Sequence, residues 1–206
     1  MDGRAKSDWS RDPYVDAAGV LENRLGLTDP AALERAETDI AFARSVELEM
    51  GALPGDYDLD HLRAVHRHLF GDVYDWAGEL RTVDIARTRF FAHAAFLEEA
   101  GRAIFEELAA EHHLRGLDRS AFVRRLAHYL GEVNALHPFR DGNGRAQRAF
   151  FGQLARDAGY RIAWDRLDPD RNRQASEASL LGDIEPLERL LDELTEDLPQ
   201  CDCAAP

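Results

Sequence analysis

The stretch from His137 to Arg148, HPFRDGNGRAQR, gathers one histidine, one aspartate, one asparagine, two glycines and three arginines. Pro138 cannot continue a helix, so we expect His137 at the C-terminal end of one helix, facing the loop that follows. Gly142 and Gly144 allow backbone conformations that bulkier residues avoid, and such conformations let successive N–H groups converge on one anion. The loop is therefore a candidate anion site with a histidine at its edge.

A helix is expected to begin at Gly142-Asn143-Gly144, and its N-terminal N–H groups and dipole add to the attraction for an anion. Arg145 and Arg148 lie three residues apart on one face of this helix, and each can bind phosphate oxygens through two N–H groups. Asp141 places a carboxylate beside the predicted phosphate site, which is a typical way to hold Mg²⁺. The pattern predicts a triphosphate site with its own base.

Each of these residues has a plainer interpretation when it is taken alone. A Gly-x-Gly at a helix start is usually a turn, and a histidine at a helix end is usually a cap or a surface residue. Asp141 alone would more often be an acidic residue that favours a helix N-terminus. The joint occurrence of these features with two arginines on one helix face favours the functional interpretation.

Composition narrows the classes of function. A chain of 206 residues suits one domain with a buried core. The formal net charge of −14 argues against a nucleic-acid-binding surface, because phosphate contacts need an excess of Lys and Arg. Residues 137–161 nevertheless hold five Arg against two Asp. The basic charge is therefore local, as a small anionic substrate requires.

No apolar run approaches the roughly 18 residues that a membrane span needs, so we expect no membrane partner. The N-terminus, MDGRAKSDWSRDPY, lacks the apolar core of a signal peptide. Cys201 and Cys203, the two cysteines, are too few for a zinc site or a disulfide framework. We interpret them as reduced thiols, and we expect a cytoplasmic location, although delivery into another cell stays open.

Hydrophobic residues recur at helical spacing along most of the chain. Asp29, Asp58 and Ser120 are the predicted N-caps of three helices, and Pro30 stands at a first helical position. The helices are expected over residues 30–50, 59–70, 96–112, 121–136, 142–159, 169–181 and 186–197.

Residues 79–93 depart from this period. Leu80, Thr82, Val83 and Ile85 nearly alternate with polar residues, and the polar turn Arg87-Thr88-Arg89 follows. This pattern predicts a β-hairpin between two helices. The fold class is therefore all-α: one compact helical domain over residues 13–195 with an inserted hairpin, between tails at 1–12 and 196–206.

The motif HPFRDGNGRAQR matches the signature of the Fic family, His-Pro-Phe-x-Asp/Glu-Gly-Asn-Gly-Arg-x-x-Arg, at every specified position. Residues 58–86 and 19–44 also resemble the helix and hairpin upstream of that motif and the N-terminal helix of many bacterial members. The resemblance implies a compact helical domain that transfers AMP from ATP to a hydroxyl of a target protein, with release of pyrophosphate.

The resemblance also implies a role for each motif residue. His137 resembles the general base, and Asp141 resembles the ligand of a Mg²⁺ ion that bridges the α- and β-phosphates of ATP. Arg148 is similar to the second motif arginine, which orders the γ-phosphate. The implied anion hole consists of Gly142, Asn143 and Gly144, with Arg145 also on the phosphates.

Residues 79–93 resemble the flap of the family, which binds the modifiable loop of the target protein by strand addition. Arg87 and Thr88 stand where many members place a Lys-Gly pair that touches the nucleotide. Tyr160 and Trp164 either line the adenine pocket or pack in the core, and Trp76 is expected to be a packing residue. Ordinary surface or core positions are expected for His61, His66, His68 and His93.

Three functions stay open at this point. The first is transfer of AMP to a Ser, Thr or Tyr hydroxyl. The second is the kinase-like Fic branch or another nucleotide-monophosphate transfer, but the kinase-like branch has Lys where this chain has Gly144. The third is a non-catalytic protein-binding module, which has no need of His137, Asp141 and Arg148 together.

Many Fic proteins are inhibited by a glutamate in a Ser/Thr-x-x-x-Glu-Gly/Asn motif, which pairs with the second motif arginine. Here that spacing occurs once, from Ser45 to Glu49, and Met50 follows where the motif has Gly or Asn. We therefore expect the glutamate to come from a small antitoxin-like partner and to bind Arg148, as in Fic toxin–antitoxin pairs, with this chain as the toxin.

Overall fold

The computed structural model describes residues 12–86 and 91–198. These residues form seven α-helices and a two-stranded antiparallel sheet. The helices are α1 (Pro30–Met50), α2 (Leu59–Phe70), α3 (Leu97–Ala110), α4 (Arg119–Leu136), α5 (Asn143–Asp157), α6 (Pro169–Leu180) and α7 (Glu185–Leu194). Short 3-10 turns lie at Ala94–Phe96, His112–Leu114 and Trp164–Arg166. The predicted all-α class is confirmed.

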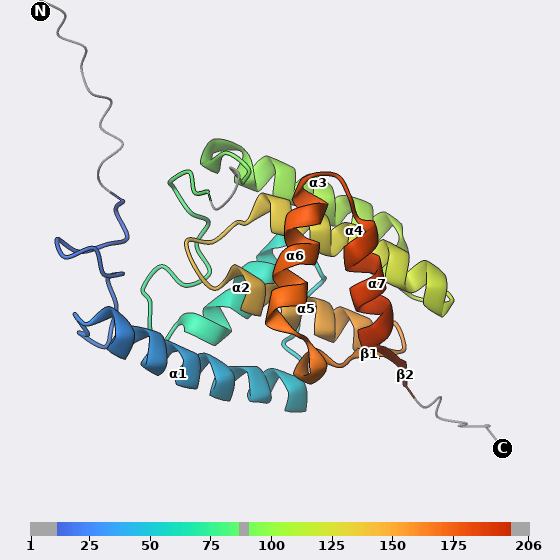
Figure 1. The fold of residues 1–206 in the computed structure, drawn as a ribbon, viewed down its shortest axis with the longest axis horizontal. Helices are drawn as coiled ribbons and strands as arrows, with labels where there is room; N and C mark the ends of the chain where they lie inside the picture. Colours follow the sequence, from blue (N-terminus) through green and yellow to red (C-terminus); the bar gives the residue numbers. More distant parts are fainter. Residues whose placement is uncertain (1–11, 87–90, 199–206) are drawn as a thin grey trace, which may run out of the picture.

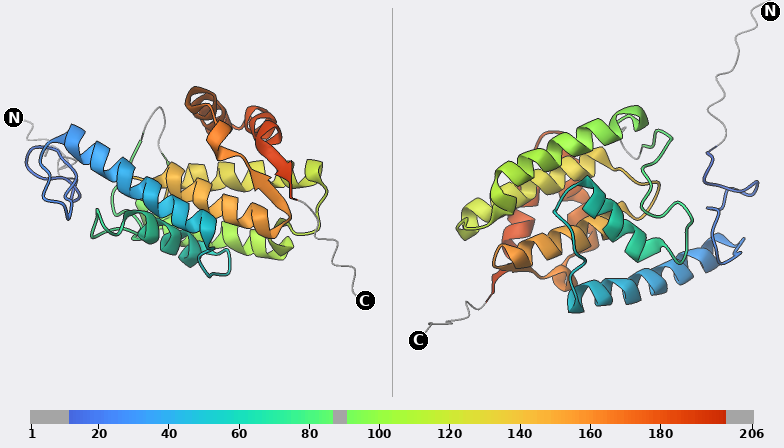
Figure 2. Two further views of the ribbon diagram at one scale, coloured as in Figure 1. Left: turned by 90° about the horizontal axis from the view of Figure 1, so that it is seen from below. Right: turned by 180° about the vertical axis from the view of Figure 1, so that it is seen from behind.

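The helices are arranged around α4 and α5, which pack against each other (Figure 1). Helix α3 lies along α4, while α2 and α1 pack against the other side of α5. Helices α6 and α7 pair with each other and form a separate layer over α4 (Figure 2). The loop that joins α4 to α5 therefore lies between the α1–α2 side and the α6–α7 layer.

The helix boundaries follow from local caps. Asp29 accepts hydrogen bonds from the amides of Ala31 and Ala32, and Asp58 accepts one from His61, so both predicted caps are confirmed. The prediction of Ser120 as the cap of α4 was wrong. Asp118 accepts from the amide of Ala121 instead, and α4 begins at Arg119.

The core is made of the apolar faces of these helices. Leu62 of α2, Phe122 and Leu126 of α4, and Phe150 and Phe151 of α5 are each fully buried. The α6–α7 layer is held to it by one leucine-rich face of α7, composed of Leu187, Leu190, Leu191 and Leu194. Burial of these side chains is the main term that holds the two layers together.

The C-terminal end differs from the prediction. Helix α7 was expected to reach Asp197, but it ends at Leu194 because Thr195 takes an extended backbone. Thr195–Asp197 form β2, which pairs antiparallel with β1 (Tyr160–Ile162), and Arg161 lies opposite Glu196. This pairing ties the end of the described chain to the segment that follows α5.

Residues 79–86 and 91–93 form an excursion between α2 and α3, where the hairpin was predicted. Its two arms meet through the N–H of Phe91, which donates to the carbonyl of Ile85 over 3.3 Å. Neither described arm is a regular strand. We call residues 79–93 the flap; the predicted turn at Arg87 and Thr88 lies outside the described residues.

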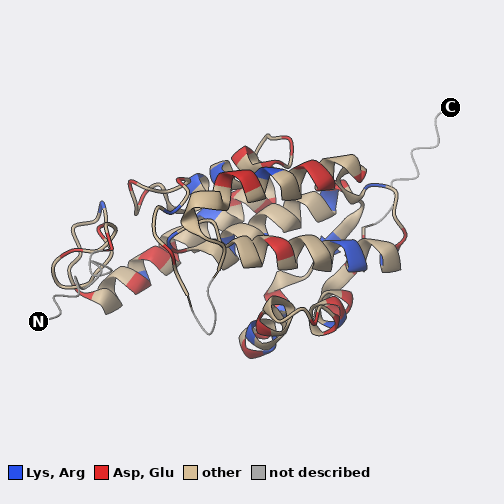
Figure 3. Cartoon of the chain, turned by 90° about the horizontal axis from the view of Figure 1, so that it is seen from above, with Lys and Arg blue, Asp and Glu red and all other residues tan. Residues whose placement is uncertain are grey.

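No helix in the described part of the chain has the length and apolar character needed to cross a membrane. Acidic and basic residues both occur along most of the helices (Figure 3).

Candidate active site

His137 caps the C-terminal end of α4, as its position before Pro138 predicts. Its backbone is left-handed, with φ 46°, and its N–H still donates to the carbonyl of Val133 over 3.0 Å. Nδ1 of the imidazole lies 3.3 Å from the carbonyl oxygen of Asn134. When Nδ1–H donates to that oxygen, Nε2 is the basic nitrogen of the ring. This is the tautomer that a general base needs.

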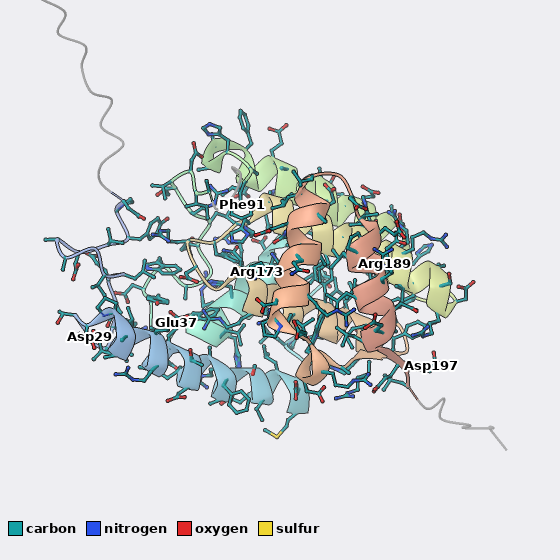
Figure 4. All side chains as sticks on the ribbon, in the orientation of Figure 1. Asp29, Glu37, Phe91, Arg173, Arg189 and Asp197 are labelled. Carbon is teal, nitrogen blue, oxygen red and sulfur yellow. The ribbon has the colours of Figure 1, made fainter. Side chains whose placement is uncertain are left out.

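The ring of Phe91 stacks on this imidazole, with centroids 3.8 Å apart and an interplanar angle of 14°. Because Phe91 belongs to the flap, the contact places the second arm of the flap directly over the candidate base. Phe91 is labelled in Figure 4.

The loop after His137 is closed by the side chain of Asn143, which is 3% exposed. Its Oδ1 accepts from the N–H of Phe139 over 2.9 Å, and its Nδ2 donates to the carbonyl of Phe139 over 2.7 Å. The amides of Asn143 and Gly144 have no acceptor within the described residues. They begin a helix of 15 residues, so two N–H donors and the helix dipole are available to an anion.

The two glycines have different roles. Gly142 has φ 76°, and a Cβ there would lie 2.5 Å from the Phe70 ring, so both backbone and space require glycine. A Cβ on Gly144 would meet only Arg148, at 3.4 Å, which is an ordinary contact. Gly144 is therefore not demanded by packing, and it leaves room for a ligand to approach the amides.

His66 supports this loop from behind, although the sequence pattern predicts no particular role for it. It is fully buried on α2, and its ring stacks on Phe139 at 3.9 Å. Its Nδ1 accepts from the N–H of Gly78, so Nε2 carries the proton and donates to the Asp141 carbonyl over 2.9 Å. Burial lowers the pKa of His66 to about 4, which keeps this hydrogen-bonded form neutral near pH 7.

Asp141 fits the part of a metal ligand. Its side chain is 48% exposed at the rim of the loop, and the N–H of Gly142 donates to its Oδ1 over 2.5 Å. No cluster of three or more potential metal ligands occurs in the residues that the structure describes. A single half-exposed carboxylate suits Mg²⁺, which keeps several waters and takes most of its other ligands from substrate phosphates.

Arg145 and Arg148, three residues apart on α5, have different surroundings. Arg145 forms an ion pair with Glu37 of α1, lies 3.8 Å from Asp141 and packs its guanidinium over Phe70. Glu37 is only 7% exposed and also accepts a hydrogen bond from the hydroxyl of Tyr74. The position of Arg145 is therefore set before any ligand binds.

Arg148 has no carboxylate within 4 Å among the described residues. Burial, followed by the nearby charge of Arg145, lowers the pKa of Arg148. A half-buried guanidinium beside a second guanidinium, with no counter-ion, is stabilised by a bound anion. Glu49 is exposed and forms no ion pair with Arg148.

These groups line a cavity of about 770 Å³, a size usual for small-molecule sites. Seven of the predicted site residues meet on its wall, namely His137, Asp141, Gly142, Asn143, Gly144, Arg145 and Arg148. The remaining two, Arg87 and Thr88, lie outside the described residues. On the opposite side the cavity is lined by Trp164, Asn172, Ser176 and Leu190.

The aromatic residues that were candidates for the adenine pocket, Tyr160 and Trp164, have different surroundings. Tyr160 is a core residue: it stacks on Phe122 at 4.3 Å, and its hydroxyl donates to the carbonyl of Leu117. Trp164 lines the cavity. Trp76 packs against Tyr74 at 4.3 Å, which confirms its predicted packing role.

Several known proteins are similar to this chain in sequence. The sequence model of the Fic/DOC family matches residues 56–155. The protein adenylyltransferase VbhT of Bartonella schoenbuchensis is 47% identical over 188 residues, which are 90% of this chain and 39% of VbhT. The chain thus spans about two fifths of that relative. The probable protein adenylyltransferase Fic of Escherichia coli K12 is 40% identical over 189 residues, which are 91% of this chain and 94% of the relative.

A solved structure gives the same result for the fold. The N-terminal Fic domain of a putative cell filamentation protein from Bartonella quintana, with bound ADP, superposes with a TM-score of 0.82 at 26% identity. The match covers 90% of this chain and 94% of that one. On its sequence and its fold alike, the chain belongs to the Fic/DOC family.

Proposed function

We propose that the protein is a protein adenylyltransferase, an enzyme that transfers AMP from ATP to a Ser, Thr or Tyr hydroxyl of a target protein. The observation that carries the proposal is that His137, Arg148 and the amides of Asn143 and Gly144, which have no acceptor among the described residues, line one cavity. VbhT is named a protein adenylyltransferase, the Escherichia coli relative is named a probable one, and ADP is bound in the solved Fic domain. ATP is therefore the proposed co-substrate.

The cavity has chemically distinct ends. Its phosphate end is formed by the start of α5, where the free amides and Arg148 supply hydrogen bonds and positive charge. Its other end is formed by Trp164, Asn172 and Ser176, which offer one aromatic face and two small polar groups. We place the triphosphate at the first end and the adenine at the second.

In this arrangement Nε2 of His137 takes the proton from the target hydroxyl as its oxygen attacks the α-phosphorus. The bond between the α-phosphorus and the oxygen that bridges to the β-phosphate breaks, and pyrophosphate leaves. The amides of Asn143 and Gly144 and the guanidinium of Arg148 bind the negative charge of the leaving group. His137 later releases the proton to solvent. The chain contributes mainly positioning and charge neutralisation.

We assign Asp141 as the residue that holds Mg²⁺, with Arg145 fixed beside it by Glu37. A Mg²⁺ ion held there would neutralise negative charge on the phosphates of ATP. The support for this assignment is the exposed carboxylate at the phosphate end of the cavity.

The flap is the proposed docking site for the target protein, by strand addition. Ile85 and Phe91, one from each described arm, line the cavity near His137, so a segment bound to the flap would lie close to the base. Arg87 and Thr88 remain proposed nucleotide contacts from the flap turn. No nucleic-acid or membrane partner is proposed, and the cytoplasm is the proposed location.

A glutamate supplied in trans by a small antitoxin-like partner is the proposed inhibitor. Arg148 has no carboxylate partner in the described part of the chain, and the one glutamate with the inhibitory spacing, Glu49, is exposed at the end of α1. A partner carboxylate on Arg148 would occupy the position of the γ-phosphate.

Label transfer tests the proposed reaction. The protein is incubated with Mg²⁺, a bacterial lysate as the source of acceptor proteins, and ATP labelled at either the α- or the γ-phosphorus. We expect α-label on protein and no γ-label, with none from the His137→Ala variant. Transfer of γ-label would identify the kinase-like reaction, and transfer of neither label would contradict the proposal.

A further inference from the structure

We propose that Arg81 is a positioning residue that couples the flap to the base His137. The inference rests on the proposed function, in which His137 is the base and the flap binds the target. Arg81 lies near the start of the first arm of the flap, and its side chain is fully buried. The motif does not include it, and it does not line the cavity.

Among the described residues, the guanidinium of Arg81 donates to backbone carbonyls and to no side chain. Nε donates to the carbonyl of His137 over 2.8 Å, and Nη1 donates to that of Val83 over 2.7 Å. Nη2 donates to the carbonyl of Leu136 over 3.3 Å and also to that of Ala92. The backbone N–H of Arg81 adds a bond to the Pro138 carbonyl over 2.9 Å.

These acceptors belong to three segments. Leu136, His137 and Pro138 are the end of α4 and the start of the catalytic loop, where carbonyls lack helical partners. Val83 lies on the first arm of the flap, and Ala92 lies on the second. One planar group with fixed N–H directions therefore sets the separation of both flap arms from the backbone that carries the base.

The second arm carries Phe91, which stacks on the His137 ring. Ala92, the next residue, accepts from Arg81 and donates its own N–H to the carbonyl of Ala135 over 3.0 Å. Arg81 thus holds the imidazole through its backbone and holds the ring that covers it through the neighbouring residue.

Burial of the Arg81 guanidinium is energetically unfavourable, and an apolar side chain could fill the same space without this penalty. The nearest carboxylate, on Asp84, is 3.9 Å away, and Asp84 itself pairs with His93. Burial lowers the pKa of Arg81, since a buried cation without a close counter-ion is unfavourable. The compensation is a set of charge-assisted hydrogen bonds to carbonyls on three segments.

The test compares Arg81→Gln and Arg81→Lys with Arg67→Gln, which removes an arginine that is 54% exposed and pairs with Glu79. Two quantities are measured for each variant: the affinity for a non-hydrolysable ATP analogue, and the rate of AMP transfer from α-labelled ATP to lysate proteins at saturating ATP. Loss of positioning by about 1 Å costs on the order of 100-fold in rate. We expect a loss of about that size in Arg81→Gln, analogue affinity within about twofold of wild type, partial recovery in Arg81→Lys, and no loss in Arg67→Gln.

A second readout does not depend on activity. NMR of histidine-labelled protein reports the ring-current shift that Phe91 imposes on His137, and we expect Arg81→Gln to reduce that shift while the buried His66 resonance stays in place. Addition of guanidinium to Arg81→Ala should restore part of the shift. If the wild type transfers no AMP, the proposed function fails, and the NMR result still decides the role of Arg81.

Unchanged His137 resonances and an unchanged transfer rate in Arg81→Gln would overturn the inference. Parallel losses of analogue affinity, rate and folding in both Arg81→Gln and Arg81→Lys would also overturn it, because they would show a purely structural role.

Discussion

The two walls of the cavity are built in different ways. The first wall is formed by residues 137–148, which are the α4–α5 loop and the start of α5. It is held from behind by buried polar side chains: His66 donates to the Asp141 carbonyl, Arg81 donates to the His137 carbonyl, and Asn143 closes the loop. The opposite wall is formed by Trp164 together with α6 and α7, and the leucine face of α7 holds these two helices against the core. The outer surface of this wall carries exposed ion pairs such as Arg171–Glu193.

The two kinds of contact differ in how strongly they depend on geometry. Hydrogen bonds from rigid buried groups fix an atom in both distance and angle, as an in-line displacement requires. Apolar packing stabilises a position without directing a particular atom, and exposed ion pairs add little. We infer that the first wall performs the chemistry and that the second recognises the nucleoside. Changes on the first wall should alter the rate, and changes on the second should alter affinity alone.

The largest effect is expected at the base. His137→Ala should lower the rate of AMP transfer by about 10²–10⁴-fold, because the target hydroxyl loses its proton acceptor. Affinity for an ATP analogue should change little, since the phosphate contacts belong to other residues. Calorimetry and α-label transfer on the same preparation measure both quantities. Near-normal transfer by this variant would remove His137 from the mechanism.

The two arginines of the motif are expected to differ in how much each contributes to binding of the ATP analogue. Arg148→Gln should weaken binding of the ATP analogue by about 10–100-fold, the worth of a charge-assisted hydrogen bond, and should slow transfer. Arg145→Gln should weaken it less, because Glu37 already holds the Arg145 guanidinium. Titration of both variants with the ATP analogue shows which arginine contributes more to affinity. A larger loss for Arg145→Gln would place the triphosphate elsewhere.

The second wall is tested at Trp164. Trp164→Leu should reduce analogue affinity by about 2–10-fold, the size of a typical aromatic contact, and should leave the transfer rate at saturating ATP unchanged. The core residue Tyr160 supplies the matched control: Tyr160→Phe loses only its bond to the Leu117 carbonyl and should leave affinity unchanged. A fall in the saturated rate of Trp164→Leu would break the proposed division between the walls.

A smaller effect concerns pH and lies away from both walls. Burial lowers the pKa of His61 below its ordinary value of 6.5. Below about pH 6.5, His61 is therefore protonated more in the unfolded chain than in the folded chain. Stability should therefore fall as the pH drops through about 6.5 toward the folded-state pKa. In His61→Asn, Oδ1 can still accept from the Tyr57 amide, and the loss of stability between pH 7.5 and 5.5 should be smaller.

Urea unfolding at the two pH values measures that difference. His93→Asn, which changes a histidine whose side chain is 68% exposed, is the control. Equal pH dependence in wild type and His61→Asn would contradict this account.

The smallest effect is expected at Glu49. Glu49→Gly should leave AMP transfer unchanged, because Glu49 is exposed and makes no ion pair with Arg148. The α-label assay on wild type and variant checks this. A large rise in transfer would show an inhibitor built into the chain and would exclude the need for a partner.

The sequence was sufficient to predict the helices and the motif loop, because both depend on local spacing. Periodicity and the Asp29 and Asp58 caps placed α1 and α2, and seven motif residues line one cavity. Local signals were insufficient where two neighbouring residues could each serve as the N-cap of the same helix, as Asp118 and Ser120 could for α4. They were also insufficient where a distant strand ends a helix, as β1 does for α7.

The supporting residues could not be found in this way. Glu37 meets Arg145 across 108 positions, His66 meets Asp141 across 75, and Arg81 meets His137 across 56. No sequence period relates residues so far apart. A histidine or arginine that will be buried cannot be told from other polar residues in the sequence, because its partner is identified only in the folded structure. The groups that position the site are therefore less visible in sequence than the groups that perform the chemistry.

The central claim is tested most directly by a structure of the protein with a non-hydrolysable ATP analogue and Mg²⁺. We expect phosphate oxygens within hydrogen-bond distance of the Asn143 and Gly144 amides and of Arg148, the adenine beside Trp164, and the α-phosphorus as the phosphorus nearest to Nε2 of His137. A γ-phosphorus nearest to His137, or a triphosphate away from the start of α5, would contradict AMP transfer by this site.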